Sequence, residues 1–562
     1  MTARVTKHFV TVGNRRVHYH RAGEGPATLL LHASPCSVKV LRLPLEIFAT
    51  RFTAVAIDTP GFGLSDPLPG ERLEIENFAD AAADTLAALG IEHTSVYGRH
   101  TGAQIAVELA VRHPARCSMA LTDGYPVFSP DMDWSRIDEY LLPLVPSWDG
   151  THLIWAWYRY REQHIFWPWN AQRLANRADS DMPDCAFLQR GVVELLEAGD
   201  GYRIGYASAF RHQGRKALEA LTVPTCFGGR PGDSLYTHLK LLPDHVWRME
   251  MPRDAHAAAR AELAMLLKHP ARGTPPPAPA TAPLPGRSTP DYVDLHDSQV
   301  LIRSIGDLRS AAPAPVVVIH HAPGSSALYD DLIRAIGAKH PVIALDLPGH
   351  GESEPGPDAI QSVEAWAETV FRVLNTLGIG AMHVYGHNGG AAVAVEMALR
   401  ASGRVRSITL DAPVFLSEAE QQDVAPRWLD GVLPATPVWD GSHLLRMWHM
   451  RRDMALWWPW YSRRIVNARA SEPPIDPGRL SAEVREMMKQ PESFASAWRA
   501  VLDYPMRARL ALTVPPCAVI GAATDLFAPC LAAARGVRPD ARAMDIDDSA
   551  QARADAVLSN IS

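Results

Sequence analysis

The stretch Val96-Tyr97-Gly98-Arg99-His100-Thr101-Gly102-Ala103 decides how this chain folds. Glycines stand two positions before and two positions after His100, directly behind an apolar run. This spacing is typical of a sharp strand-to-helix elbow that presents a nucleophilic side chain above a sheet. The central position of such an elbow normally holds Ser, Cys or Asp, whereas here it holds His100. The stretch therefore indicates a fold more directly than it indicates a reaction.

The same elbow occurs a second time, with Asn388 at its centre, as Val384-Tyr385-Gly386-His387-Asn388-Gly389-Gly390-Ala391. The two centres lie 288 positions apart, and Asp58-Thr59-Pro60-Gly61-Phe62-Gly63-Leu64-Ser65-Asp66 recurs at that offset, from Asp346 to Glu354. Trp148-Asp149-Gly150-Thr151-His152-Leu153 recurs from Trp439, 291 positions later. A long, nearly constant offset indicates two copies of one domain rather than a solenoid.

A stretch rich in Pro, Ala and Thr, ARGTPPPAPATAPLPGRSTP at 271–290, separates the two copies. So many prolines leave too few backbone donors to join a sheet, so we expect an extended, semi-rigid linker. The first domain is then predicted at 1–270 and the second at 291–562.

Each copy alternates short apolar runs with helical patterns. Runs at 27–31 and 52–57 in the first copy match runs at 315–319 and 341–345 in the second. Apolar strands that alternate with helices indicate a mostly parallel, doubly wound sheet covered on both faces.

Composition excludes several classes of protein. Hydrophobic residues make up 47% of the 562 positions and the net charge is −7, which fits a globular protein and disfavours nucleic-acid or anionic-membrane partners. No apolar run reaches the roughly 18 residues that span a bilayer, and the N-terminus lacks an apolar signal core. The six cysteines have no metal-ligand spacing. We therefore expect reduced thiols and a cytoplasmic location.

Taken together, these segments resemble the α/β-hydrolase superfamily. The resemblance is carried by His32-Ala33-Ser34-Pro35, the segment from Asp58, the elbow, Val223-Pro224 and Asp254-Ala255-His256, with His320-His321-Ala322-Pro323-Gly324-Ser325 in the second copy. It implies two tandem α/β-hydrolase-fold domains, each with a helical cap, and a small-molecule substrate. It does not fix the reaction, because this fold carries many chemistries.

The resemblance places the caps at 128–217 and 415–507, and both are rich in aromatic residues. These aromatics either pack the cap helices onto the sheet or line a substrate pocket. Trp148 and Trp155 are candidates for such a pocket. His152 would add a polar group to it, or else take a structural role at the start of a helix.

In a working member of the family, the elbow residue attacks, a late-loop His acts as base and a carboxylate orients that His. Carried onto this chain, the roles fall to His100, His256 and Asp233, with Asp123 as a second candidate acid. The backbone amides of Thr101 and of Ala33 or Ser34 would form the oxyanion hole. The imidazole of His32 would assist there.

The chemistry of His100 stays open at this stage. Imidazole is a nucleophile, but the acyl-imidazole it forms is labile. His100 and His256 would alternatively form an acid/base pair that activates water. A metal bound by His32, His100, His256 and an Asp is a third interpretation, without supporting local spacing, and a degenerate, non-catalytic elbow is a fourth. We expect no metal and no cofactor.

The second copy lacks two of the three catalytic groups, the reactive elbow residue and the late His. Asn388 does not attack at neutral pH, and Met544-Asp545-Ile546-Asp547-Asp548-Ser549-Ala550 stands where the late His is expected. Only Asp525, at the acid position, and His320, the counterpart of His32, remain. We therefore expect a catalytically silent copy, although His321, His350 and His387 leave room for an unusual site.

The leading hypothesis is a hydrolase that cleaves an ester-like or other activated bond in a small, partly apolar substrate, in the first copy. A cofactor-free lyase, isomerase or oxygenase would need a base and an oxyanion hole but no nucleophile. A binding protein without turnover is the third hypothesis. We expect the two copies to pair within the chain, and assembly into a homo-oligomer stays open.

Overall fold

The computed structural model describes residues 3–128, 137–308, 313–356, 361–427, 435–527 and 530–561. The chain divides into two compact units: Met1–Val145 with Trp155–Ala282, and Pro146–Ile154 with Pro283–Ser562. The boundary after Ala282 falls inside the stretch predicted as linker. Parts of both predicted caps, 129–136 and 428–434, lie outside the described residues. No helix among the described residues is long and apolar enough to span a bilayer.

The predicted linker is not free of the folded units. Thr281 Oγ1 donates to the backbone oxygen of Phe9 at 3.0 Å, and Ala271 is buried. At its other end, Thr289 and Pro290 already belong to a strand, where Pro290 lies opposite Arg303. The expectation that this stretch joins no sheet is wrong at that end, because proline is tolerated in an edge strand.

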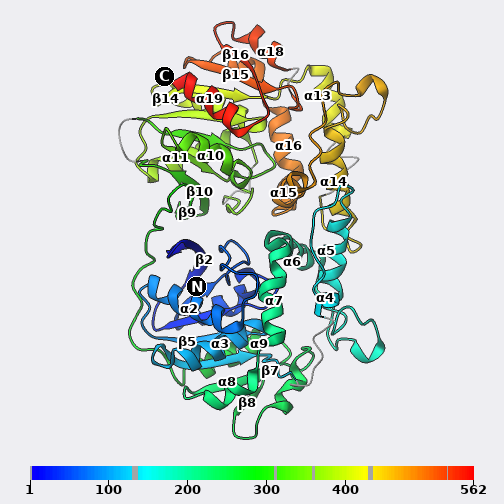
Figure 1. Ribbon diagram of the computed structural model, residues 1–562. Coiled ribbons are helices and arrows are strands. Elements are labelled where there is room, and N and C mark those ends of the chain that lie inside the picture. The colour runs from blue at the N-terminus through cyan, green and yellow to red at the C-terminus, as the bar shows by residue number, and fades with distance from the viewer. Residues whose placement is uncertain are drawn as a thin grey trace. The chain divides into compact units, whose positions relative to one another are not determined.

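The first unit contains an eight-stranded sheet in the order β1-β2-β4-β3-β5-β6-β7-β8. Figure 1 labels β2, β5, β7 and β8 of this sheet. The strands are β1 (Thr6–Val12), β2 (Arg15–Ala22), β3 (Ala27–Leu31), β4 (Thr53–Ile57), β5 (Thr94–Arg99), β6 (Cys117–Asp123), β7 (Thr225–Gly229) and β8 (Trp247–Glu250). The pairs β1–β2 and β2–β4 are antiparallel and all others are parallel.

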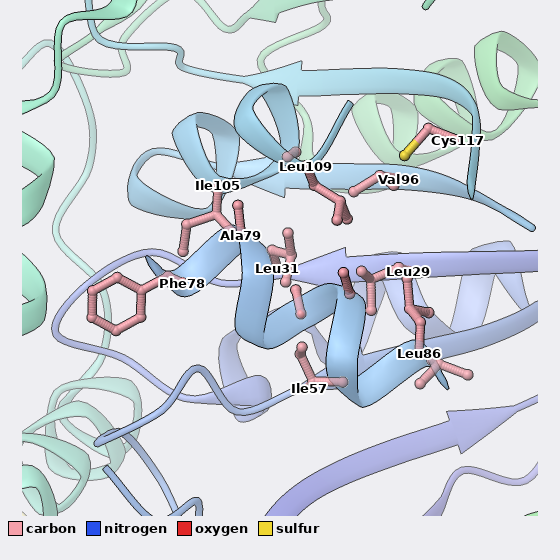
Figure 2. Packing of buried hydrophobic residues seen from close by; sticks show 14 of the residues in the cluster. Leu29, Leu31, Ile57, Phe78, Ala79, Leu86, Val96, Ile105, Leu109 and Cys117 are labelled. Atoms are coloured by element: carbon pink, nitrogen blue, oxygen red, sulfur yellow. The ribbon is translucent and has the colours of Figure 1, made fainter. Parts of the chain in front are cut away.

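Helices cover both faces of this sheet and form a hydrophobic core on each face. Alternate residues of a strand pack into one core or the other. Leu29 and Leu31 of β3 pack with α2 (Ile75–Ala88) and α3 (Thr101–Arg112), whereas Leu30 packs with α1 (Arg42–Phe48) and α9 (Ala255–Leu266). Figure 2 shows the first of these cores, with its α2 and α3 side chains directed at the strands. The apolar runs are continuous because both faces of each strand are buried.

The second unit repeats this topology in a sheet ordered β16-β15-β14-β13-β11-β12-β10-β9. Its strands are β9 (Thr289–Asp294), β10 (Gln299–Ile305), β11 (Val316–Ile319), β12 (Val342–Leu345), β13 (Met382–His387), β14 (Val405–Asp411), β15 (Cys517–Ala522) and β16 (Arg542–Ile546). Its main helices are α10 (Asp330–Gly337), α11 (Val363–Thr376), α12 (Gly389–Arg400), α18 (Cys530–Val537) and α19 (Ala550–Ile561). The predicted duplication of a mostly parallel α/β domain is confirmed.

The cap regions are helical. Between β6 and β7 lie α4 (Ile137–Tyr140), α5 (Thr151–Glu162), α6 (Cys185–Ala198), α7 (Tyr202–Arg211) and α8 (Gly214–Ala220). Between β14 and β15 lie α13 (Glu418–Ala425), α14 (Ser442–Met454), α15 (Pro477–Met487), α16 (Phe494–Asp503) and α17 (Met506–Leu510).

One cap carboxylate makes the stability of the first unit depend on pH. Glu194 of α6 is buried and accepts a hydrogen bond from the backbone N–H of Ser37 at 2.6 Å. Burial raises its pKa to about 7. The folded state therefore holds a proton that the unfolded chain releases near pH 4.5, and stability falls as pH rises from about 4.5 to about 7.

Replacing Glu194 by Gln is expected to remove this contribution, which is on the order of 3 kcal/mol. Urea denaturation of Glu194→Gln between pH 5 and pH 8 should show a weaker pH dependence than the parent protein. Glu219→Gln, the same change at an exposed site on α8, is the matched control and should leave the dependence unchanged. Parallel curves for Glu194→Gln and the parent would show that Glu194 does not titrate in this range.

Candidate functional site

Both elbows adopt the same unusual backbone conformation. His100 has φ 50° and ψ −111°, and Asn388 has φ 48° and ψ −113°. The backbone N–H of His100 donates to the oxygen of Asp123, and that of Asn388 donates to the oxygen of Asp411, which ties each elbow to the neighbouring strand. Non-glycine residues with positive φ cost free energy and concentrate at functional sites.

The flanking glycines are required by close backbone contacts. A Cβ on Gly98 would lie 2.1 Å from the oxygen of Gly102, and a Cβ on Gly102 would lie 2.2 Å from the oxygen of Leu31. Gly386 and Gly390 meet corresponding atoms in the second unit. The glycine spacing therefore reports how tightly the helix packs on the strand ends.

In the first unit, the elbow imidazole contacts a carboxylate directly. His100 Nε2 lies 3.0 Å from Oδ1 and 2.9 Å from Oδ2 of Asp233, which follows β7. Burial alone would raise the pKa of Asp233, but the charge and hydrogen bond of His100, and then the charge of Arg99, hold it well below its usual range. Asp233 is therefore ionised at neutral pH and accepts the Nε2–H of His100.

This hydrogen bond fixes the tautomer of His100. With the proton on Nε2, the neutral ring keeps a lone pair on Nδ1. Nδ1 has no hydrogen-bond partner among the described residues, and the side chain is 28% exposed. The carboxylate of Asp233 thus orients a partly exposed ring whose Nδ1 has no partner among these residues.

Gly124, next to Asp123 at the end of β6, makes room for the ring. A Cβ at Gly124 would lie 2.6 Å from Cδ2 and 2.9 Å from Nε2 of His100. The second unit has Ala412 at the corresponding position, at φ 41°, beside the smaller Asn388. The first unit is therefore shaped for an imidazole at its elbow.

Asp123, the second candidate for the orienting acid, does not take that role. It is fully buried, and its Oδ2 lies 2.7 Å from Arg230 NH2 and 3.5 Å from Arg99 Nε. Arg230 also binds Glu262, at 3.1 Å, and burial raises the pKa of Glu262 to about 7. Asp123 thus belongs to a buried ionic cluster beneath the elbow, and Asp233 alone contacts the imidazole.

His256 does not meet His100, so the predicted pair of imidazoles is not formed. His256 is exposed in the first turn of α9, whose first N–H groups are capped by Asp254. It makes no hydrogen bond, ion pair or ring contact with any described residue. The physical reason is its place in the fold: His256 belongs to the first turn of α9 and its side chain is exposed, while His100 contacts Asp233 directly.

His32 is a structural residue rather than an oxyanion donor. Its Nδ1–H donates to the oxygen of Ala33 at 2.9 Å, and its Nε2 accepts from the N–H and hydroxyl of Thr59 at 2.9 and 2.6 Å. His320 repeats this arrangement with His321 and Leu347. Both rings are buried and fully engaged, which corrects the catalytic interpretation of His32.

The other predicted oxyanion residues follow the ends of β3 and β5. Thr101 is the first residue of α3, where a backbone N–H has no partner within the helix. Ala33 and Ser34 follow β3 and are partly exposed.

The cap candidates are divided between the two units. Trp148 is 68% exposed, and both it and His152 belong to the second unit, whereas His100 belongs to the first. His152 accepts from the N–H of Ser147 at 3.2 Å and contacts the hydroxyl of Ser481 at 3.1 Å. Both of its nitrogens are used, which favours the structural role. Trp155 is partly buried in the first unit.

The elbow of the second unit is held differently. Asn388 donates from Nδ2 to the oxygen of Ala412 at 3.0 Å. Asp525 lies at the predicted acid position, but its Oδ1 binds Arg553 NH2 at 3.0 Å and is 3.9 Å from His387 Nε2. Arg553 also binds Asp411 and Asp548, at 2.8 and 2.7 Å. An arginine from α19 therefore occupies the carboxylates of this copy.

A cavity of about 540 Å³ opens above this second elbow, and sequence reasoning did not place it. It is lined by Asn388, His387, His321 and Tyr329, by cap helices α14 and α15, and by Arg553. Tyr329 and Arg553 carry no motif that would have identified them. The adjacent histidines at 320 and 321 were a visible signal, although only His321 faces the cavity.

A metal site at the first elbow has no support from side-chain geometry. Among the described residues, the one group whose ligand atoms lie within 4.8 Å of one another is Glu76, Glu108 and His212. It includes neither His100 nor His256. Glu108 and His212 are already joined by a buried hydrogen bond at 2.8 Å.

Comparison with known proteins agrees with this architecture. A family model described as alpha/beta hydrolase fold matches residues 32–155 and 314–446, one region in each unit. The chain is 37% identical over 115 residues to the dihydrolipoyllysine-residue acetyltransferase component of the acetoin cleaving system of Pseudomonas putida, covering 20% of this chain and 30% of that protein. It is 28% identical over 195 residues to epoxide hydrolase 3 of Mus musculus, covering 34% and 49%.

The chain therefore spans less than half the length of either curated relative. Among solved structures, the enol-lactonase from Burkholderia xenovorans LB400 is 20% identical, with a TM-score of 0.36, over 48% of this chain and 97% of that one.

Proposed function

Because this chain belongs to the α/β-hydrolase superfamily, we propose that its first copy hydrolyses an ester-like or similarly activated bond in a small, partly apolar molecule. The observation that carries this proposal is the contact of His100 Nε2 with both carboxylate oxygens of Asp233, at an elbow with strained backbone. An imidazole oriented in this way is suited to general-base catalysis, which supports the proposal over the interpretation of a degenerate elbow.

The proposed reaction needs no covalent intermediate. His100 Nδ1 takes a proton from a water molecule while the water oxygen forms a bond to the electrophilic carbon. Asp233 stabilises the imidazolium that results, as the carboxylate does in a catalytic triad. When the tetrahedral intermediate collapses, the Nδ1–H returns its proton to the leaving group.

The developing oxyanion would be stabilised by backbone amides. The N–H of Thr101 points from the start of α3, where the helix dipole also favours negative charge. The N–H of Ala33 or Ser34, after β3, would supply the second donor. Removing one such donor typically costs about 10²–10³-fold in kcat.

The second copy is proposed not to catalyse this reaction. Asn388 replaces the base, and Asp525 is bound by Arg553 instead of orienting an imidazole at the elbow centre. No late histidine follows β16, where the chain reads Asp547-Asp548-Ser549.

A quench experiment tests the mechanism. The full chain is mixed with p-nitrophenyl acetate, p-nitrophenyl hexanoate or styrene oxide in ¹⁸O-water, and product and protein are analysed by mass spectrometry after one turnover. We expect ¹⁸O in the product and no covalent adduct on the protein. An acylated residue, or labelling by a fluorophosphonate, would replace the proposed water attack by a covalent route. Proton abstraction from a ketone substrate without hydrolysis would instead favour a cofactor-free lyase or isomerase.

A further inference from the structure

The cavity of the second unit has an arginine on its wall that pairs with no carboxylate. Arg469 lines the cavity and is partly exposed. One of its terminal nitrogens donates to the backbone oxygen of Met454 at 3.2 Å, and the other donates to those of Thr524 and Asp525 at 3.0 and 2.8 Å. Arg469 forms no ion pair with any described residue. The guanidinium is therefore held in place by neutral groups.

These three hydrogen bonds orient the guanidinium without satisfying it. A guanidinium has five N–H groups and one positive charge. Three bonds use at most three of these groups, so at least two N–H groups of Arg469 have no partner among the described residues. Burial lowers the pKa of Arg469, which means that water solvates the cation incompletely. A cation in such a place is costly unless an anion pairs with it.

The other charged groups of the wall already have ionic partners. Asp331 pairs with Arg334 outside the cavity. A single added negative charge would face Arg469 directly, whereas a second would find no free cation and would meet the carboxylates of Asp525 and Asp548. The other ion pairs are Arg451 and Arg479 with Glu483, Arg479 with Asp548, and Arg553 with Asp411, Asp525 and Asp548.

Apolar side chains form much of the remaining wall. They come from α10 and from the cap helices α14, α15 and α16, and they include Leu332, Met454, Leu480, Met487 and Trp498. The volume of about 540 Å³ is in the range of pockets that bind small molecules. The cavity therefore suits a ligand with one charged head and an apolar body.

This arginine is specific to the second copy. The backbone N–H of Arg469 donates to the oxygen of Leu456, and the equivalent bond of the first copy runs from Ala178 to Ile165. Both residues of the pair are shifted by 291 positions, the offset of the surrounding repeat. The first copy thus has a methyl group where the second has a guanidinium, so the charge is no shared requirement of the two caps.

We propose that this cavity is a binding site for a small monocarboxylate with an apolar body. The carboxylate accepts hydrogen bonds from the free N–H groups of Arg469 and supplies its missing counter-charge. The body lies against the apolar wall. A monoanion is favoured over a dianion because, of the four arginines that line the cavity, Arg469 alone has no ionic partner among the described residues. The site does not depend on the hydrolysis proposed for the first copy.

A series of phenyl compounds tests the charge of the head group. Dissociation constants of benzoate, benzamide and phenylphosphonate are measured on the full chain by ligand-observed NMR at pH 8. Benzoate should bind at least about tenfold more tightly than benzamide, its neutral isostere, because charge-assisted hydrogen bonds are about twice as strong as neutral ones. Phenylphosphonate, a dianion at this pH, should bind no more tightly than benzoate. Equal or tighter binding of benzamide, tighter binding of phenylphosphonate, or no binding of benzoate would overturn the proposal.

Variants of Arg469 test its role as the anchor. Arg469→Gln removes the charge and should weaken benzoate binding at least about tenfold, while benzamide binding changes less than about twofold. Arg469→Lys keeps the charge and should bring benzoate binding to within about fivefold of the parent. Arg464→Gln, the same change at an exposed position of the same loop, is the matched control and should leave both dissociation constants unchanged.

A cavity-filling variant locates the binding. Ala482→Trp places a large side chain on the cavity wall and should abolish benzoate binding, with the folding of every variant checked by circular dichroism. If Arg469 only ties the cap to the loop after β15, Arg469→Gln would leave the preference for benzoate over benzamide unchanged, and the proposal would be wrong. Benzoate binding that survives Ala482→Trp would contradict it equally, because the ligand would then lie outside this cavity.

Discussion

Replacing His100 by alanine is expected to lower kcat/KM for the hydrolysed substrate by about 10²–10⁴-fold, which is the usual contribution of a positioned general base. The fold should survive, because the ring is partly exposed. Its loss removes a partner from one buried charge only, that of Asp233. Steady-state kinetics of His100→Ala, with circular dichroism as a folding check, make the measurement. A variant that keeps full activity would show that the chemistry lies elsewhere.

The dyad of His100 and Asp233 predicts a specific non-additivity. Asp233→Asn should lower kcat strongly on its own, because an amide would no longer stabilise the imidazolium or fix the tautomer. The double variant should be little worse than His100→Ala alone, since residues that act as a unit are not additive. His256→Ala is the matched control, an imidazole lost from an exposed site in the same unit, and should retain activity within about twofold. Loss of activity in His256→Ala would restore the late histidine to the mechanism.

Local sequence rules were sufficient for the architecture. The glycines at 98 and 102 follow from backbone contacts that any residue with a Cβ would violate, so their spacing identifies the elbow wherever it occurs. Continuous apolar runs such as 27–31 follow from burial on both sheet faces. The antiparallel strands β1 and β2 carry mixed, polar sequences at the sheet edge and gave no comparable signal.

The site was less predictable, because it depends on how far side chains reach. Position in the sequence put His100, Asp233 and His256 near one edge of the sheet, but only the length of the imidazole determines that His100 contacts Asp233 directly. Gly124, which has no side chain, leaves the space that the longer ring of His100 needs. A family pattern built on a short serine does not anticipate either contact.

Residues far away in the sequence were the other part of the second unit's site that the sequence did not predict. Arg553 lies on the last helix and Tyr329 precedes α10, and neither belongs to a motif. Tyr329 contacts His387 of the second elbow, and Arg553 binds Asp411 and Asp525, because parallel strands bring distant loops to one edge of the sheet. Charge compensation in the second copy therefore appears only in three dimensions.

Replacing Arg553 by methionine is expected to lower the free energy of unfolding of the second unit by about 3–5 kcal/mol, the usual cost of removing one partner from a buried ionic group. The side chain is 11% exposed and separates the carboxylates of Asp411 and Asp525. Burial already raises the pKa of both, and without the guanidinium their ionised forms would face one another in a buried site.

Urea denaturation followed by circular dichroism measures this loss at pH 8 and again at pH 5. The difference between Arg553→Met and the parent should shrink at the lower pH, because protonation of Asp411 or Asp525 removes the uncompensated charge. Arg334→Met provides the control: this arginine is 47% exposed and pairs with Asp330, and its loss should cost less than about 1 kcal/mol. Equal losses for the two variants would mean that Arg553 contributes no more than a surface ion pair, and the second elbow would then not depend on charge compensation for its stability.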